Sequence, residues 1–129
     1  MNFVKSQREV SQAGMEMYRL MMHLLEWEIV SNRGYQTSDV SHLLPEYKRA
    51  FFLKLPPGTA MHKHVDCGDC ETDHVVMQTN AGCLNFWCDD DGDHSVHMEE
   101  GLRYNVDRTV LHWAENNGDT DRVHLLVEY

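Results

Sequence analysis

Residues 49–87, RAFFLKLPPGTAMHKHVDCGDCETDHVVMQTNAGCLNFW, decide the fold class of this chain. Short runs of β-branched and aromatic residues alternate there with turn residues, such as Pro56-Pro57-Gly58 and Asn80-Ala81-Gly82. The same pattern continues to the C-terminus, with further turns at Asp91-Gly92 and Asn117-Gly118-Asp119. We therefore predict short strands at residues 50–55, 61–65, 74–78, 83–87, 95–98, 104–106, 109–113 and 123–128. Such regular strands without helical patterns between them indicate a sandwich or a barrel.

The residues before this region predict a helical N-terminal segment. Ser6-Gln7-Arg8-Glu9 has the spacing of a capping box, which predicts a helix start. Apolar residues then recur at intervals of three and four, so we expect a helix over about residues 7–30. The residues on this expected apolar face are Val10, Ala13, Met17, Leu20, Leu24 and Trp27. We predict a single domain over residues 1–129, with a helical N-terminal portion at 1–48 and a β core at 49–129.

Length and charge narrow the functional classes. The chain has 129 residues, the size of one ordinary domain. Its formal net charge of −10, from 21 acidic and 11 basic residues, disfavours binding to nucleic acid, whose phosphates would be repelled. No apolar run reaches the roughly 18 residues needed to cross a bilayer, and residues 1–10 lack the pattern of an export signal. We expect a cytoplasmic protein without a nucleic-acid or membrane partner, and the sequence does not define its oligomeric state.

The segment His-Lys-His-Val-Asp at 62–66 suggests a metal site. Alternate side chains of a strand share a face, so His62, His64 and Asp66 are expected to project together. A further ligand must come from elsewhere, and His112 lies in a later predicted strand. Two imidazoles and one carboxylate hold iron(II) while leaving open positions for other ligands. Strand alternation alone does not choose between His62 and His64.

Arg122 is a candidate carboxylate-binding residue. It stands ten residues after His112, beyond the turn Asn116-Asn117-Gly118-Asp119. A turn there lets the next strand return beside the first and brings the guanidinium into the same cavity. The planar fork of donors on arginine suits a carboxylate. The structural alternative is a surface ion pair with Asp121 or Glu128, but an arginine within the apolar segment Arg-Val-His-Leu-Leu-Val favours an inward position.

Four motifs, in order, resemble the aspartyl/asparaginyl β-hydroxylase-type branch of the 2-oxoglutarate/Fe(II) oxygenases. They are Leu-Pro-Pro-Gly-x5-His-x-Asp at 55–66, His-x4-Thr-Asn-x2-Cys at 74–83, Glu-Gly-x2-Tyr-x2-Asp at 100–107 and His-x3-Asn-x5-Arg-x-His-Leu at 112–125. The resemblance covers residues 55–129, and the ordered set is more specific than any single motif. It implies a mainly β protein, a double-stranded β-helix (jelly-roll, cupin-like) barrel, with the N-terminal helix packed against it and the metal bound inside its mouth.

The same resemblance implies roles for individual residues. His64, Asp66 and His112 resemble the metal-binding positions of the family, and the spacing from Gly58 to His64 favours His64 over His62. Arg122 resembles the residue that holds the distal carboxylate of 2-oxoglutarate. Two further residues resemble polar positions of the co-substrate pocket, and these are His74 and His124.

The implied activity is a dioxygenase reaction with Fe(II) as cofactor and O2 and 2-oxoglutarate as co-substrates. It would hydroxylate a C–H bond of a small-molecule or peptidyl substrate, of which amino acids and aspartyl, asparaginyl or prolyl groups are the classes known for the family. At the position two residues before His74, where the family often carries an arginine, this chain has Thr72. Trp87, Trp113 and Tyr104 are candidates for pocket walls, although aromatic residues in strands usually belong to the core.

Two other interpretations stay open at this point. In a non-catalytic, cupin-like module that binds a small molecule, His62 would bind metal and Asp66 would be dispensable. In a zinc-stabilised interaction domain, the ligands would be cysteines. The four cysteines of the chain are Cys67, Cys70, Cys83 and Cys88.

Overall fold

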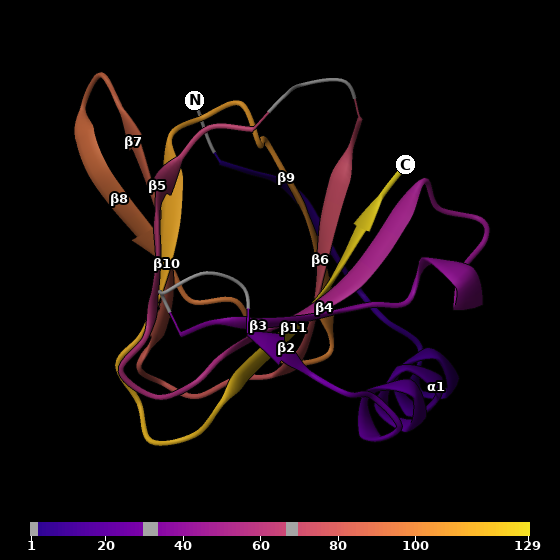
Figure 1. The fold of residues 1–129 in the computed structure, drawn as a ribbon. Helices are drawn as coiled ribbons and strands as arrows, with labels where there is room; N and C mark the ends of the chain where they lie inside the picture. Colours follow the sequence, from indigo (N-terminus) through magenta and orange to yellow (C-terminus); the bar gives the residue numbers. More distant parts are fainter. Residues whose placement is uncertain (1–2, 30–33, 67–69) are drawn as a thin grey trace.

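The computed structural model describes residues 3–29, 34–66 and 70–129. Its strands form two antiparallel sheets that face each other across the interior of an open barrel (Figure 1). The larger sheet contains, in spatial order, β1 (Val4–Glu9), β9 (Leu102–Val106), β6 (Thr72–Gln78), β11 (Arg122–Glu128), β4 (Arg49–Leu55), β3 (Gln36–Asp39) and β2 (Glu28–Ile29). The smaller sheet contains β5 (Ala60–His64), β10 (His112–Asn116), β7 (Cys83–Asp89) and β8 (Gly92–Val96).

These sheets form the mainly β, cupin-like jelly-roll barrel that the sequence predicts. The helices that accompany them in the described residues are α1 (Gln12–His23) and the short 3-10 helix η1 (Ser41–Leu43). The N-terminal portion is less helical than expected, because β1, β2 and β3 all come from residues 1–48 and join the larger sheet. No helix within the described ranges combines the length and the apolar character that crossing a membrane requires.

The start of α1 differs from the sequence prediction. Residues 6–9, expected to form a capping box, lie in β1 and pair with β9, where Ser6 lies opposite Asn105. The helix instead begins after Ser11, whose hydroxyl oxygen accepts a hydrogen bond from the Gly14 amide at 3.0 Å. The prediction was wrong because a long-range strand partner, which local spacing does not reveal, satisfies the backbone of residues 4–9.

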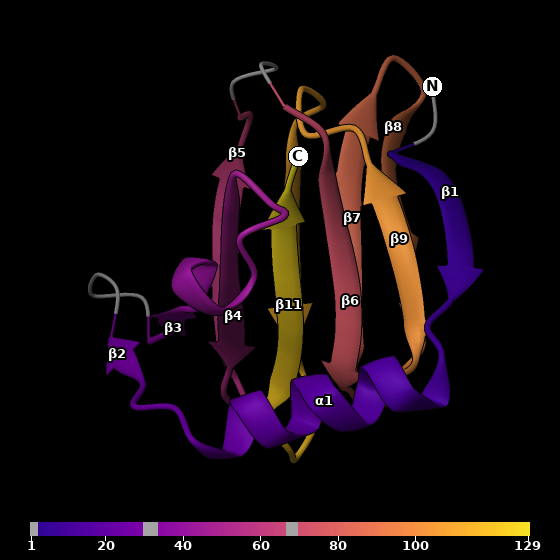
Figure 2. The same cartoon turned by 90° about the vertical axis from the view of Figure 1, so that its right-hand side faces the viewer.

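The expected apolar face is only partly the one that packs: Val10 and Trp27, which flank α1, contact the core as predicted, but the middle of that face does not. Met17, Leu20 and Leu24 are 46%, 67% and 85% exposed, respectively. The residues that contact the outer face of the larger sheet are Met15, Tyr18, Met21, Met22 and Leu25. Figure 2 shows α1 lying across that face. Because this helix carries apolar residues on more than one side, their spacing does not decide which side is buried.

Strand alternation gives the larger sheet two chemically different faces. In β11, Val123, Leu125 and Val127 join the core under α1. The alternate side chains, which include Arg122 and His124, turn toward the barrel interior. The apolar layer thus fixes β11 from outside while the same strand presents polar groups inside.

The turn after β10 carries the chain from one sheet to the other. The Asn116 side chain is fully buried and donates hydrogen bonds to the carbonyl oxygens of Leu55 and Thr120, both at 2.8 Å. Consequently β11 does not return beside β10, as the sequence suggested, but pairs with β4 and β6. Arg122 therefore approaches the interior from the sheet opposite His112.

Leu125→Ala should lower the free energy of unfolding by about 2–5 kcal/mol, because it removes a fully buried side chain from the core under α1. Urea unfolding measures this difference. Leu24→Ala, the same substitution at a position 85% exposed, should change it by less than about 0.5 kcal/mol. Equal losses in the two variants would contradict the packing described here.

Candidate metal centre and its cavity

A cavity of about 510 Å³ lies between the two sheets and is lined from both of them. Its lining includes the three expected metal ligands, which are His64, Asp66 and His112, together with His74 and Arg122. Residues far apart in the sequence therefore meet around one cavity.

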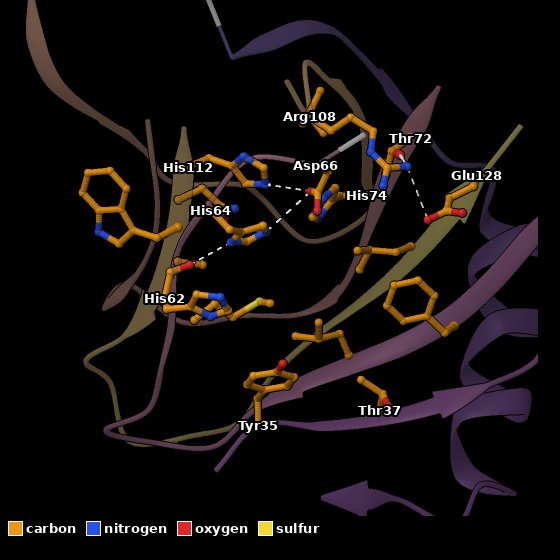
Figure 3. A pocket seen from close by; sticks show the side chains of 18 of the residues that line it. Tyr35, Thr37, His62, His64, Asp66, Thr72, His74, Arg108, His112 and Glu128 are labelled. Carbon is orange, nitrogen blue, oxygen red and sulfur yellow. Dashed lines mark hydrogen bonds and ion pairs between the residues drawn. The ribbon is translucent and has the colours of Figure 1, made fainter. Parts of the chain in front are cut away.

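His64 and His112 lie directly opposite each other in the pairing of β5 with β10. Asp66 follows the end of β5, where its backbone amide donates to the Arg108 carbonyl at 2.9 Å. The Nε2 atoms of His64 and His112 are 3.5 and 3.4 Å from Asp66 Oδ2 (Figure 3). Ligand atoms of the three residues all lie within 4.8 Å of one another, so the cluster can hold one metal ion.

Hydrogen bonds fix the orientation of both imidazoles. His64 Nδ1 lies 2.7 Å from the His62 carbonyl oxygen, and His112 Nδ1 lies 2.6 Å from the Val110 carbonyl oxygen. A carbonyl only accepts, so each Nδ1 carries a proton. Each Nε2 faces Asp66, where it can donate to the carboxylate when the ring is protonated or offer its lone pair to a metal. This arrangement, in which the second nitrogen donates to the backbone, is typical of histidines that bind a metal.

The electrostatics of the cluster also suit a cation. Hydrogen bonds with His112 and His64 hold the pKa of Asp66 well below its usual range. The hydrogen bond with Asp66 raises the pKa of His64. Asp66 is therefore an ionised acceptor at neutral pH, and the donor set fits a divalent metal that accepts imidazole and carboxylate ligands. His62 contributes its carbonyl to His64, and its ring is not part of the cluster.

Arg122 is buried in the cavity wall and is 2% exposed. Its Nε and Nη2 atoms lie 2.9 and 2.7 Å from the two ring nitrogens of His124. Nη1 is buried and has no hydrogen-bond partner among the described residues. Burial lowers the pKa of Arg122 to about 10, so it remains a cation at neutral pH. Asp121 pairs with Lys54 and Glu128 pairs with Arg108, so the surface ion pair considered for Arg122 is not formed.

His74 and His124 form a buried pair beside this guanidinium. Their Nδ1 atoms are 3.0 Å apart. Burial, reinforced by the charge of Arg122, lowers the pKa of His74 to about 3 and that of His124 well below its ordinary value. Both rings are therefore neutral near pH 7. His74 lines the cavity, whereas His124 lies outside that lining and contacts Arg122.

Arg108 is a cavity residue that the sequence analysis missed. It lies in the loop between β9 and β10, and its Nη1 donates to Thr72 Oγ1 at 3.1 Å. The side chain at position 72, where the related family often has an arginine, thus contacts an arginine from another part of the chain. Its only sequence signal is its place four residues before His112.

Two of the three aromatic wall candidates lie elsewhere. Trp113 lines the cavity. Tyr104 is 2% exposed in a separate core cluster, against which Trp87 packs. The default interpretation of strand aromatics as core was therefore right for these two.

The cysteines do not assemble a metal site in the described part of the chain. The His64, Asp66 and His112 cluster is the group found there, and it contains no cysteine. Cys83 is 3% exposed within β7, as expected for a small core residue. Cys67, a proposed zinc ligand, lies outside the described residues.

The fold and the site define this protein as a jelly-roll protein with a cavity that combines a two-histidine, one-aspartate cluster and a buried guanidinium. The family model for aspartyl/asparaginyl beta-hydroxylase matches residues 27–129. The chain belongs to this family. A search of curated proteins found no match.

Solved structures share the fold at low sequence identity. A 2OG-Fe(II) oxygenase family oxidoreductase from Burkholderia pseudomallei superimposes with a TM-score of 0.77 at 7% identity, covering 91% of this chain and 77% of that one. HygX from Streptomyces hygroscopicus, with nickel and 2-oxoglutarate bound, gives 0.74 at 6% identity, covering 95% and 80%. A predicted oxalate decarboxylase from Thermotoga maritima gives 0.58 at 21% identity, covering 82% and 93%.

Removing Asp66 or His64 by substitution with alanine should weaken metal binding by at least the roughly 10–100-fold that loss of an outer hydrogen-bond partner causes. Titration with Co(II), followed by its visible absorption, measures this affinity. His62→Ala is the matched control and should bind one Co(II) per chain as the unsubstituted protein does. Loss of binding with His62→Ala and retention with Asp66→Ala would favour the cupin-like ligand set instead.

The buried histidines predict a loss of stability in mild acid. His74 titrates near its ordinary value of 6.5 when unfolded and near 3 when folded, so the unfolded state binds more protons between these values. The free energy of unfolding should therefore be highest above pH 6.5. Below that pH it should fall by up to about 1.4 kcal/mol per pH unit for each such histidine. His64, whose pKa is raised, acts in the opposite direction, but it is present in every variant compared.

Urea unfolding of metal-free protein between pH 6.5 and 5 measures this dependence. His74→Gln should show a smaller decrease than the unsubstituted protein, and the exposed His42→Gln should show the same decrease. An unchanged slope in His74→Gln would mean that His74 is protonated in the folded state.

Proposed function

We propose that this protein is a 2-oxoglutarate- and Fe(II)-dependent dioxygenase that hydroxylates a C–H bond of an amino acid or of an aspartyl, asparaginyl or prolyl group. The observation that carries the proposal is a buried guanidinium that has no carboxylate partner among the described residues and lies in the same cavity as the His64, Asp66 and His112 cluster. An uncompensated buried cation is unfavourable unless a ligand neutralises it. A ligand that reaches both features needs a metal-chelating end and a distal carboxylate, and 2-oxoglutarate has both.

His64, Asp66 and His112 would hold the iron, since two imidazoles and one carboxylate are the ligand set of non-haem iron(II) oxygenases. With iron, O2 and 2-oxoglutarate bound, the co-substrate is oxidised to succinate and CO2 while one oxygen atom enters a C–H bond of the substrate. The protein's share is to bind and orient these molecules and to exclude water.

Each polar residue of the cavity has a distinct task in this proposal. Arg122 binds the distal carboxylate of 2-oxoglutarate, and the neutral His124 ring orients the guanidinium by accepting a hydrogen bond from it at one ring nitrogen. His74 is neutral, so it can offer a hydrogen bond to the co-substrate without adding a second buried charge. The sheets enclose the site from both sides.

We further propose that the protein acts in the cytoplasm on a small-molecule or peptidyl substrate. The net charge of −10 supports a partner other than nucleic acid.

Arg122→Met tests the proposal because methionine keeps much of the volume and removes the charge. Affinity for 2-oxoglutarate should fall by about 30-fold or more, since losing one partner of a buried charge pair costs roughly 2–5 kcal/mol. The Tm of the ligand-free variant should not fall, because an uncompensated buried cation is also removed. Anaerobic titration of the Fe(II)-loaded protein, followed by its visible charge-transfer band, measures the affinity.

Arg19→Met is the matched control, because the Arg19 side chain lies on α1, is 43% exposed and has Glu100 as its acidic partner at 3.9 Å. It should bind 2-oxoglutarate normally. Equal binding by Arg122→Met and the unsubstituted protein would contradict the assigned role. Metal binding without any succinate release from 2-oxoglutarate would favour the non-catalytic, cupin-like module.

A further inference from the structure

A second arginine of the cavity, Arg108, is joined to the metal cluster through its backbone. The Arg108 carbonyl accepts the Asp66 amide at 2.9 Å, so its backbone holds a cluster residue in place. Its side chain lines the same cavity as Arg122. Figure 3 shows Arg108, Thr72 and Glu128 together on the side of the cavity away from His64 and His112.

The contacts of Arg108 hold its guanidinium in one position. Nη1 lies 3.0 Å from Cys70 Sγ, 3.1 Å from Thr72 Oγ1 and 3.4 Å from Glu128 Oε1. Nε is buried and has no hydrogen-bond partner among the described residues. The side chain is 18% exposed, so this cation is largely desolvated and still has donor capacity.

Glu128 does not neutralise this part of the cavity by itself. Its Oε1 atom is shared between Arg108 and Arg49, whose Nη1 lies 3.7 Å away. The other carboxylate of the described lining, that of Asp66, contacts His64 and His112. Among the described lining residues there are three guanidiniums and two carboxylates, in a chain whose formal net charge is −10. The excess of arginine is thus local, and it favours an anionic ligand.

The three arginines also lie at different depths. Arg122 is 2% exposed, whereas the side chains of Arg108 and Arg49 are 18% and 55% exposed. A co-substrate held at Arg122 therefore lies deeper than Arg108. Arg108 and Arg49 thus line the outer part of the cavity, where a second anionic ligand can contact them while the co-substrate is bound.

We propose that Arg108 is a specificity-determining residue that binds a carboxylate of the substrate, so that the substrate is an acidic amino acid or an amino acid with a free carboxylate. This inference rests on the proposed dioxygenase function, since it assumes that Arg122 is occupied by 2-oxoglutarate. Arg108 supplies a charged donor within the same wall that carries Asp66, so a bound carboxylate sets the distance between the substrate and the metal cluster.

The test compares L-aspartate, L-asparagine and L-proline, each with the derivative in which every carboxylate is converted to an amide. Protein loaded with Ni(II) and 2-oxoglutarate binds without turnover, and calorimetry or ligand-observed NMR gives the affinity. At least one acid should bind about tenfold or more tightly than its amide, as expected for a hydrogen bond between charged groups. Arg108→Met should abolish this preference, and Arg108→Lys should keep part of it because the charge remains.

Two controls make the outcome decisive. Arg108→Met should still bind 2-oxoglutarate through Arg122, which shows that the variant is folded, and Arg19→Met should keep the full preference for acids. If no acid binds better than its amide to the unsubstituted protein, or if Arg108→Met keeps the preference, the assignment to Arg108 is wrong. If 2-oxoglutarate itself fails to bind, the proposed function fails instead, and the preference at Arg108 is then measured with Ni(II) alone.

Discussion

The site depends on the antiparallel pairing of β5 with β10, which sets His64 opposite His112. A shift of this register by one residue would turn one imidazole to the other face of its strand, because side chains alternate with a period of two. The backbone hydrogen bonds of both Nδ1 atoms then direct the Nε2 atoms at the same point. Asp66 completes the cluster from the loop that follows β5, where the Arg108 carbonyl holds its amide.

The larger sheet contributes a buried positive charge, the guanidinium of Arg122, to the same cavity. In the part of the chain that the structure describes, Arg122 has no carboxylate partner, and it contacts the neutral imidazole of His124. Such a group costs stability in the absence of a ligand. The apolar layer between β11 and α1, with Leu125 and Val127 fully buried, stabilises the strand from its other face. The same strand therefore combines a core face, which fixes the fold, with a polar face prepared for an anion.

The sequence predicted most of the β architecture because alternating apolar residues and turn signals are local. Every strand expected between residues 50 and 128 has a counterpart, with shifts of a few residues at the ends. The sequence predictions were wrong where pairing between distant segments determines the structure. Residues 4–9 form β1 because they pair with β9, and β11 lies between β4 and β6 because it pairs with both. His64, Asp66 and His112 were found from residue type and motif spacing. Arg108 was not, because its place in the cavity depends on contacts with Thr72 and Glu128 that spacing does not encode.

The most direct test is a crystal structure of the protein grown anaerobically with Fe(II), in which the anomalous signal at the iron edge locates the metal. The account predicts one iron ion bound by Nε2 of His64, Nε2 of His112 and a carboxylate oxygen of Asp66, inside the cavity that Arg122 also lines. Iron bound by His62 without Asp66, or by the cysteines, would contradict it.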